Sequence, residues 1–392
     1  MKTARVSIAC VLWLASACGS APPVPAPTPS EPPRAVSPPP AVNPASAESP
    51  AAPVAPDAAA APVAINPDDA NNPTPRVEPS TPLITAEVAL ALVPAFSTSI
   101  GAPGAGELKG GVPLPDTGPG FRHNDRRPSQ ARYGTVEMVQ ALINASAKTQ
   151  QALASEDIVV INDLGLEHGG PIRQHGSHQA GRDVDVLFFS LDPKGKPVPS
   201  VGVPIDPKGR GIDFKDLAIR SDDVELRFDA KRTWRFVASL IEATGDELQR
   251  IFIVEHVRTM LLAEAERVKA PKKIKERFER ITCQPETPHD DHMHIRLFCS
   301  PEDIAAGCVD GSPMYPDRRQ TLKKLGLTPV METYAMRHEK KRVEGVDDRT
   351  TSMEEARTQI ESSGPMHQRV RRFLDEREAW AKKPSPGRQY CK

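Results

Sequence analysis

The stretch RQHGSHQAGRDVDVLFF, residues 173–189, leads from two histidines into an apolar segment that carries two aspartates. Apolar side chains alternate with Asp183 and Asp185 in DVDVLF, a pattern that predicts a β-strand. Burying either carboxylate costs several kcal/mol unless a partner compensates it. Because His175 and His178 precede the strand in a glycine-flanked turn, we expect that partner to be a metal ion. Hydrogen bonding within the turn or around the site is an equally open reading for His175 and Asp183.

A second histidine cluster, HDDHMHIRLFC, occupies residues 289–299. His292 and His294 are two positions apart in an expected strand, so their side chains point to the same face. In the first cluster His178 and Asp185 are seven positions apart, with a glycine between them that lets the chain turn. Two imidazoles and one carboxylate around one ion form a common catalytic zinc shell, which leaves a position open for water.

The beginning of the chain, residues 1–17, has the pattern of a secretory signal peptide. Two basic residues, Lys2 and Arg5, precede the apolar run VSIACVLWLASA, which is too short to span a bilayer. The small residues before Cys18 resemble a bacterial lipobox, although an alanine stands in place of the usual leucine. We therefore expect an exported, periplasmic protein anchored to the membrane through lipidated Cys18. An ordinary cleaved signal peptide is the alternative.

Residues 18–82 are rich in proline and alanine and carry almost no large apolar side chains. Such a segment cannot bury enough surface to offset its chain entropy, so we expect a disordered, extended tether. The formal net charge of −1 gives no indication of a nucleic-acid partner.

The folded domain is expected over residues 83–308. Its expected elements are helices at 135–154, 230–243 and 257–270 and strands at 157–165, 183–188, 250–255 and 292–299. Because these do not alternate as regular, equal units, we expect an α+β domain with a central antiparallel or mixed sheet, flanking helices and the metal site on the sheet. Residues 309–392 are charged, and a capping box from Ser352 to Glu355 is typical of a helix start. This region is expected to be a small helical appendix.

Four cysteines remain after Cys18, namely Cys283, Cys299, Cys308 and Cys391. An even set in an exported chain suggests two disulfides. Cys299 and Cys308 could close a short loop, which would leave Cys283 to pair with Cys391. Four free thiols are the alternative, less expected in an oxidising compartment.

The two histidine motifs together resemble those of the penicillin-insensitive murein endopeptidases. This family belongs to the zinc peptidases that include the lysostaphin-type enzymes, the D-Ala-D-Ala dipeptidases and the hedgehog amino-terminal domain. HGSHQAGRDVDV is similar to its first motif and HDDHMHIRLFC to its second. SIGAPGAGELKGGVPLP and RYGTVEMVQAL also resemble the family, so the likeness covers roughly residues 95–308. The tether, the charged C-terminal region and a longer segment between the motifs depart from the family's pattern.

The resemblance implies that His178, Asp185 and His294 bind catalytic zinc and that His175 is a further histidine of the metal site. It also implies that His292 assists catalysis without binding the metal and that His289 is another histidine of the active site.

General base chemistry also points to His292. Many zinc peptidases use a glutamate as the base, but neither motif contains one. His292 is therefore the candidate to take a proton or to stabilise an oxyanion, and the sequence leaves both roles open. The resemblance further implies a disulfide between Cys299 and Cys308.

The implied activity is hydrolysis of peptidoglycan cross-links at the amide bond between D-alanine and meso-diaminopimelate, with a metal-activated water. A D,D- or L,D-carboxypeptidase with the same zinc shell is one alternative, and a non-catalytic cell-wall-binding lipoprotein is another. Arg173, Arg182 and Arg232 are candidate anchors for substrate carboxylates, although a solvated surface arginine is the more common case.

Overall fold

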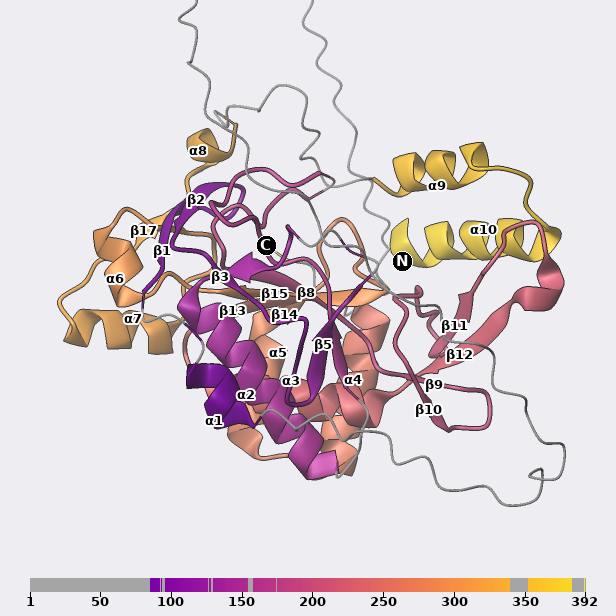
Figure 1. Ribbon diagram of the computed structural model, residues 1–392, viewed down its shortest axis with the longest axis horizontal. Coiled ribbons are helices and arrows are strands. Elements are labelled where there is room, and N and C mark those ends of the chain that lie inside the picture. Colours follow the sequence, from indigo (N-terminus) through magenta and orange to yellow (C-terminus); the bar gives the residue numbers. More distant parts are fainter. Residues whose placement is uncertain are drawn as a thin grey trace, which may run out of the picture. The chain divides into compact units, whose positions relative to one another are not determined.

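The computed structural model describes residues 85–338, 352–382 and Cys391, apart from positions 92, 94, 95, 126, 128, 129, 154–157 and 174. The expected signal peptide, the lipidation site Cys18 and the tether lie outside the described residues, and they stay predictions. No described helix is both long enough and apolar enough to cross a membrane. The described residues form the expected α+β fold around a mixed sheet (Figure 1).

The central sheet has seven strands in the order β14-β13-β15-β8-β7-β5-β4. These strands are β4 (Thr117–Gly118), β5 (Phe121–His123), β7 (Val159–Ile161), β8 (Asp183–Leu187), β13 (Leu248–Phe252), β14 (Thr282–Cys283) and β15 (His292–Leu297). β13 is parallel to β14 and β5 is parallel to β7, whereas the other neighbours are antiparallel. The strand expected at 250–255 ends at Phe252, because the next helix already starts at Glu255.

Strands β8 and β15 lie side by side in the middle of the sheet, and their register decides which side chains meet. Asp185 is paired with His294, and Asp183 is paired with Arg296. Directly opposed residues of antiparallel strands point to the same face, so both aspartates share a face with His292 and His294. The residues between them point to the opposite face and are completely buried, namely Val184, Val186, Met293 and Ile295. The alternation read from the sequence is therefore confirmed.

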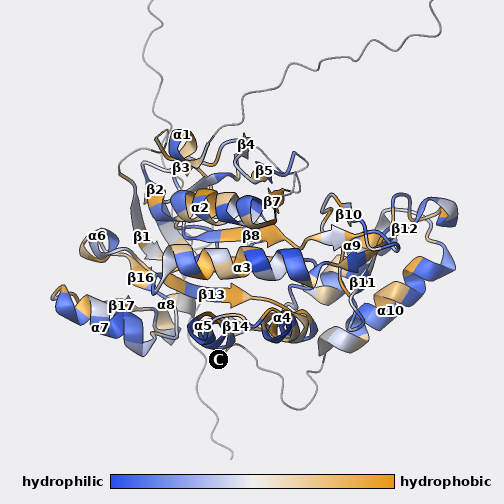
Figure 2. Cartoon of the chain, turned by 90° about the horizontal axis from the view of Figure 1, so that it is seen from below, coloured by the Kyte–Doolittle hydropathy of each residue, from blue (hydrophilic) through white to orange (hydrophobic). Residues whose placement is uncertain are grey.

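Four helices cover the apolar face of the sheet, below it in Figure 1. They are α2 (Val136–Leu153), α3 (Ala230–Thr244), α4 (Glu255–Arg267) and α5 (Lys272–Ile281). α3 begins after Asp229, whose side chain accepts a hydrogen bond from the Arg232 backbone N–H and so caps the helix. α3 packs against α2, and its Trp234 ring meets Phe278 of α5 at a centroid distance of 5.3 Å. Figure 2, seen from this side, shows the hydrophobic strands β8 and β13 between the helices.

Smaller elements surround this core. A four-stranded antiparallel sheet contains β9 (Ser190–Leu191), β10 (Pro197–Val198), β11 (Arg210–Asp213) and β12 (Val224–Phe228). Three two-stranded pairs are β1 (Thr98–Ala102) with β2 (Ala105–Lys109), β3 (Val112–Pro113) with β6 (Tyr133–Gly134), and β16 (Val309–Asp310) with β17 (Val330–Met331). Short helices are α1 (Ala86–Ala91), α6 (Pro301–Ala305), α7 (Pro316–Lys324) and α8 (Tyr334–His338), and Arg220–Asp222 forms a 3-10 turn. Tyr315 and Leu322 belong to the main hydrophobic core, which therefore extends beyond residue 308.

The C-terminal region is helical, as expected. α9 (Met353–Ser362) begins at the capping box, in which the Ser352 side chain and the Glu355 side chain each bond the other residue's backbone N–H. α10 (Gln368–Lys382) follows and lies beside β11 and β12 (Figure 1).

Two disulfides join the described cysteines, one between Cys299 and Cys308 and one between Cys283 and Cys391. The sequence left these pairings open, and the structure contains both. The second disulfide ties the end of the chain to β14, the edge strand next to β13.

Candidate metal centre and active site

The loop that leads into β8 carries the two histidines of the first motif. His178 has a φ of 70°, a left-handed conformation that is uncommon for a residue other than glycine. This conformation is accompanied by a contact of 2.6 Å between His178 Nδ1 and the carbonyl oxygen of Leu164. Gly181, with a φ of 72°, then turns the chain into β8, and a Cβ atom there would lie 2.8 Å from the Leu108 side chain. The motif therefore needs glycine at this turn.

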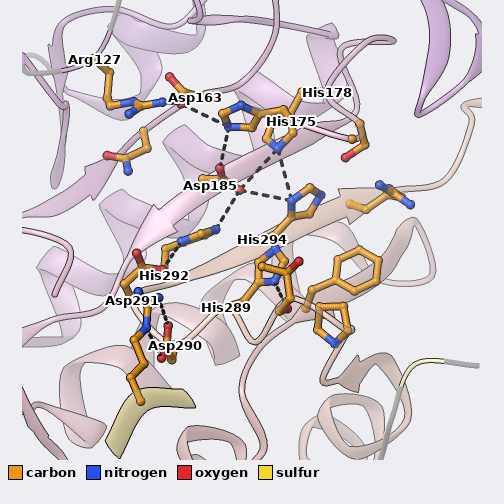
Figure 3. Close-up of a pocket in the computed structure, with 18 residues that line it drawn as sticks. Arg127, Asp163, His175, His178, Asp185, His289, Asp290, Asp291, His292 and His294 are labelled. Atoms are coloured by element: carbon orange, nitrogen blue, oxygen red, sulfur yellow. Dashed lines mark hydrogen bonds and ion pairs between the residues drawn. The ribbon is translucent and has the colours of Figure 1, made fainter. Parts of the chain in front are cut away.

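Three potential ligand atoms, from His178, Asp185 and His294, lie together above the sheet. His178 Nε2 is 3.4 Å from Asp185 Oδ1 and 3.2 Å from His294 Nδ1. His294 Nδ1 is in turn 3.2 Å from the same Asp185 Oδ1. Figure 3 shows both imidazoles turned toward Asp185. The two histidines are 116 positions apart in the chain, and the pairing of β8 with β15 brings them together.

The outer partners of the two imidazoles decide which ring nitrogens carry protons. The Leu164 carbonyl oxygen can only accept, so the proton of His178 is on Nδ1 and its Nε2 presents a lone pair. Burial lowers the pKa of His178, which favours this neutral ring. His294 Nε2 lies 2.7 Å from Asp183 Oδ1 and donates to it, so in the neutral ring that a metal ligand requires, His294 Nδ1 presents a lone pair as well.

The three atoms that face one another are thus all acceptors. Asp185 Oδ1 is buried and receives no hydrogen bond from the described part of the chain. Two lone pairs and a carboxylate oxygen at these separations repel one another unless a cation lies between them. Imidazole and carboxylate are also the ligand types that divalent transition metals accept. These three atoms therefore fit the ligands of a bound metal ion.

Asp183 orients His294 from the side away from this centre. Its Oδ1 accepts hydrogen bonds from His294 Nε2 and, at 2.6 Å, from Arg296 Nε. Burial would raise the pKa of Asp183, but Arg296 and His294 hold it well below its usual range. A carboxylate that fixes the tautomer and orientation of a metal-binding histidine is a common outer partner in such sites.

His175 contacts the second oxygen of Asp185. Its Nε2 lies 3.3 Å from Asp185 Oδ2 and 3.3 Å from Asp163 Oδ2. Burial would lower the pKa of His175, but these two carboxylates raise it to about 10. Ligand atoms of His175, His178 and Asp185 all lie within 4.8 Å of one another, so these residues could also hold a metal ion. His178 and Asp185 are common to this group and to the tighter one with His294.

His292 and His289 flank the centre on its other side. His292 Nε2 lies 3.5 Å from Asp185 Oδ1, and His292 Nδ1 lies 2.6 Å from Asp291 Oδ1. Burial would lower the pKa of His292, but Asp185 and Asp291 raise it to about 9. Burial lowers the pKa of His289 to about 3, and its Nδ1 is 2.8 Å from the Thr287 carbonyl oxygen. His292 can therefore carry a proton beside the centre, whereas His289 stays neutral.

One cavity of about 390 Å³ contains this whole arrangement (Figure 3). The sequence-predicted residues that line it are His175, His178, Asp185, His289, His292 and His294. Several other lining residues were not predicted from the sequence, among them Arg127, Asp163, Asp290, Asp291 and Arg377. Asp163 could have been suspected, since a carboxylate two residues after the buried strand β7 needs a partner. It pairs with Arg127 and His175.

The three arginines considered as substrate anchors lie elsewhere. Arg182 is buried and pairs with Asp310 at 3.2 Å, and Arg232 is buried and pairs with Asp229 at 2.5 Å. Arg173 is exposed, and it is not among the residues that line the cavity. The arginines that line the cavity are Arg127, Arg296 and Arg377.

The sequence of the domain that carries this site matches the model of a known family. The family model of the penicillin-insensitive murein endopeptidases matches residues 99–320, which is more than half of the chain. No curated protein matches the sequence. The matched range contains both histidine motifs and the whole central sheet, whereas α9 and α10 lie beyond it. The chain therefore belongs to the penicillin-insensitive murein endopeptidase family and is a peptidase that acts on peptidoglycan.

Proposed function

We propose that this chain is a zinc-dependent murein DD-endopeptidase, which hydrolyses D-alanyl–meso-diaminopimelyl amide bonds in peptidoglycan cross-links. The observation that carries the proposal is the group of three acceptor atoms from His178, Asp185 and His294, with separations of 3.2–3.4 Å. Ligand atoms about 2.0–2.1 Å from a tetrahedral zinc ion lie about 3.3–3.4 Å from one another. The spacing of the three atoms agrees with that value.

The proposed ligands are His178 Nε2, Asp185 Oδ1 and His294 Nδ1, with His175 beside them on the outer oxygen of Asp185. Three protein ligands are typical of a catalytic rather than a structural zinc site, because the fourth position stays open. Zinc held there would supply Lewis acidity, which lowers the pKa of a water molecule and polarises the scissile carbonyl.

His292 is the proposed catalytic histidine. Its Nδ1–H donates to Asp291, which leaves Nε2 directed at the metal centre. From there it can accept a proton from the attacking water or donate a hydrogen bond to the oxyanion. No described residue that lines the cavity is a glutamate, so the base used by many zinc peptidases has no counterpart among them. His289, whose ring centroid lies 4.9 Å from that of His292, is the proposed neighbour that keeps His292 in place.

The shape of the cleft favours an endopeptidase over a carboxypeptidase. A second cavity of about 270 Å³ shares Gly176, Ser177 and Arg296 with the first. Arg296 follows His294 on β15 and His292 precedes it, so the hollow extends past the metal centre in both strand directions. An endopeptidase needs room on both sides of the scissile bond, whereas a carboxypeptidase needs one side closed near a substrate terminus.

We expect the full-length chain to convert purified cross-linked muropeptide dimers into monomers. Hydrolysis of one amide adds one water, so mass analysis should find two products whose summed mass exceeds that of the dimer by one water. A chelator should stop the reaction, and added zinc should restore it. Release of terminal D-alanine from intact dimers would indicate the carboxypeptidase instead. A chain that binds peptidoglycan without changing any mass would be the non-catalytic lipoprotein.

We also propose that the protein is exported to the periplasm and anchored through Cys18. The support is the sequence pattern alone, a basic start, a short apolar run and small residues before the cysteine. The chain expressed in a Gram-negative host should incorporate labelled palmitate, and a Cys18→Ser variant should not. Equal labelling of both chains would exclude Cys18 as the acylated residue.

A further inference from the structure

Helix α10 starts well beyond residue 320, where the family match ends, yet it contributes a side chain to the active-site cavity. That side chain is Arg377, which lines the same cavity as His289 and His292. The C-terminal region, residues 309–392, which was expected to be a small helical appendix, therefore forms part of the cavity wall.

Arg377 meets the active site through Asp290, whose side chain is wholly buried. Arg377 donates from Nε to Asp290 Oδ2 at 2.9 Å and from Nη2 to Oδ1 at 2.6 Å. The Trp380 indole N–H donates to Oδ2 at 3.2 Å. Within the described part of the chain, every hydrogen bond to this carboxylate thus comes from α10. A buried carboxylate that loses such partners must move toward water or take up a proton.

Asp290 lies in the short segment that carries the proposed catalytic histidine. On one side of it, His289 has a φ of 51°, a conformation that persists only where the surroundings impose it. On the other side, Asp291 accepts the hydrogen bond that orients the His292 ring. A displacement of the Asp290 side chain would therefore pass directly to the residue that aims His292.

The metal ligands have separate supports. His178 is fixed by the Leu164 carbonyl, and His294 is fixed by Asp183 and by its ladder position opposite Asp185. None of these contacts involves α10. Loss of the α10 contact should therefore disturb His292 while the metal stays bound.

Contacts at both ends hold α10 in place. At its start, Arg369 pairs with Asp223 and with Glu225 on β12. Near its end, the Trp380 ring lies 6.2 Å from the His256 ring of α4. Beyond the helix, the disulfide of Cys391 ties the chain to β14, just before the segment that leads to Asp290. The helix can thus serve as a fixed support for that segment.

We propose that Arg377 is a positioning residue of the endopeptidase, which holds His292 toward the metal centre by anchoring the buried carboxylate of Asp290. The inference rests on the proposed function, in which His292 assists the hydrolysis. It assigns to the C-terminal region, outside the range that the family model matches, a direct part in the geometry of the site.

The test compares two arginine variants of the same helix in the full-length chain. Arg377→Gln should lower kcat on cross-linked muropeptides by up to about a hundredfold, the cost that a misplacement of about 1 Å can have. Its KM and zinc content should stay close to those of the unmodified chain. Arg369→Gln is the matched control, because it removes ion pairs of α10 without touching Asp290, and it should keep its kcat. The melting temperature of each variant shows how far the change has weakened the packing of α10 against the rest of the fold.

A double variant separates positioning from general loss of structure. In Asp290→Asn/Arg377→Gln the buried charge is gone and two amides can pair, so kcat should recover relative to Arg377→Gln alone. Asp290→Asn alone completes the cycle. The inference is overturned if Arg377→Gln keeps full kcat, if Arg369→Gln loses as much kcat, or if the losses of Asp290→Asn and Arg377→Gln simply multiply in the double variant. A full-length unmodified chain that cleaves no cross-link would instead refute the proposed function, and the inference would fall with it.

Discussion

The variant His294→Ala is expected to lose both its zinc and its ability to cleave cross-linked muropeptides. His294 Nδ1 is one of the three acceptor atoms of the centre, 3.2 Å from each of the other two. Removing only an outer partner of a metal-binding histidine costs about 10–100-fold in metal affinity, so removing the histidine should cost more than about a hundredfold. Zinc per chain, measured after dialysis, and the rate of monomer formation test this expectation.

A matched histidine control is available in the same chain. His168 is exposed and is not among the residues that line the cavity, so His168→Ala should keep its zinc and its activity. Circular dichroism of both variants checks that the fold is retained. If His294→Ala bound zinc with unchanged affinity, the metal would have to be held by the other group, His175 with His178 and Asp185.

The part of the site that the sequence predicted is the part that depends on strand geometry. A period of two residues puts Asp183 and Asp185 on one face of β8, and it puts His292 and His294 on one face of β15. The sequence did not predict that β8 and β15 are neighbours in the sheet. Once they pair, apolar burial restricts their register, because a slip by one residue would turn the histidines into the core. The expectation that the two motifs converge therefore rested on the family resemblance, and the pairing of β8 with β15 brings them together.

The missed residues depend on contacts that no local pattern encodes. The pair of Asp290 and Arg377 joins positions 87 apart, and the apolar residues of a helix show which face is buried but not which arginine meets a carboxylate. The proton position on His178 was equally hidden, since it follows from the Leu164 carbonyl, whereas hydrogen bonding by Asp183 was one of the two roles left open for it. Sequence reasoning named the proposed ligands, whereas Leu164 and Arg377 act on the site from segments that lie outside both motifs.

The variant His292→Ala is expected to keep its zinc and to lose about 10²–10⁴-fold in kcat, the usual contribution of a general acid or base. The reason is that His292 is not one of the three proposed ligands: its Nδ1 bonds Asp291, and its Nε2 faces Asp185 Oδ1 from beside the centre at 3.5 Å. Zinc content and steady-state kinetics on muropeptide dimers measure the two effects separately. The combination distinguishes His292 from His294, whose loss should remove the metal as well.

Added imidazole provides the sharpest control for this variant. The alanine leaves a space beside Asp291 in a cavity of about 390 Å³, so free imidazole can enter and take the place of the missing ring. Partial recovery of kcat with imidazole, at constant zinc content, would support a chemical role for the ring. Loss of zinc from His292→Ala would make His292 a metal ligand. Full activity without imidazole would mean that another group transfers the proton. His289, with its ring centroid 4.9 Å from that of His292, would then be the next residue to replace.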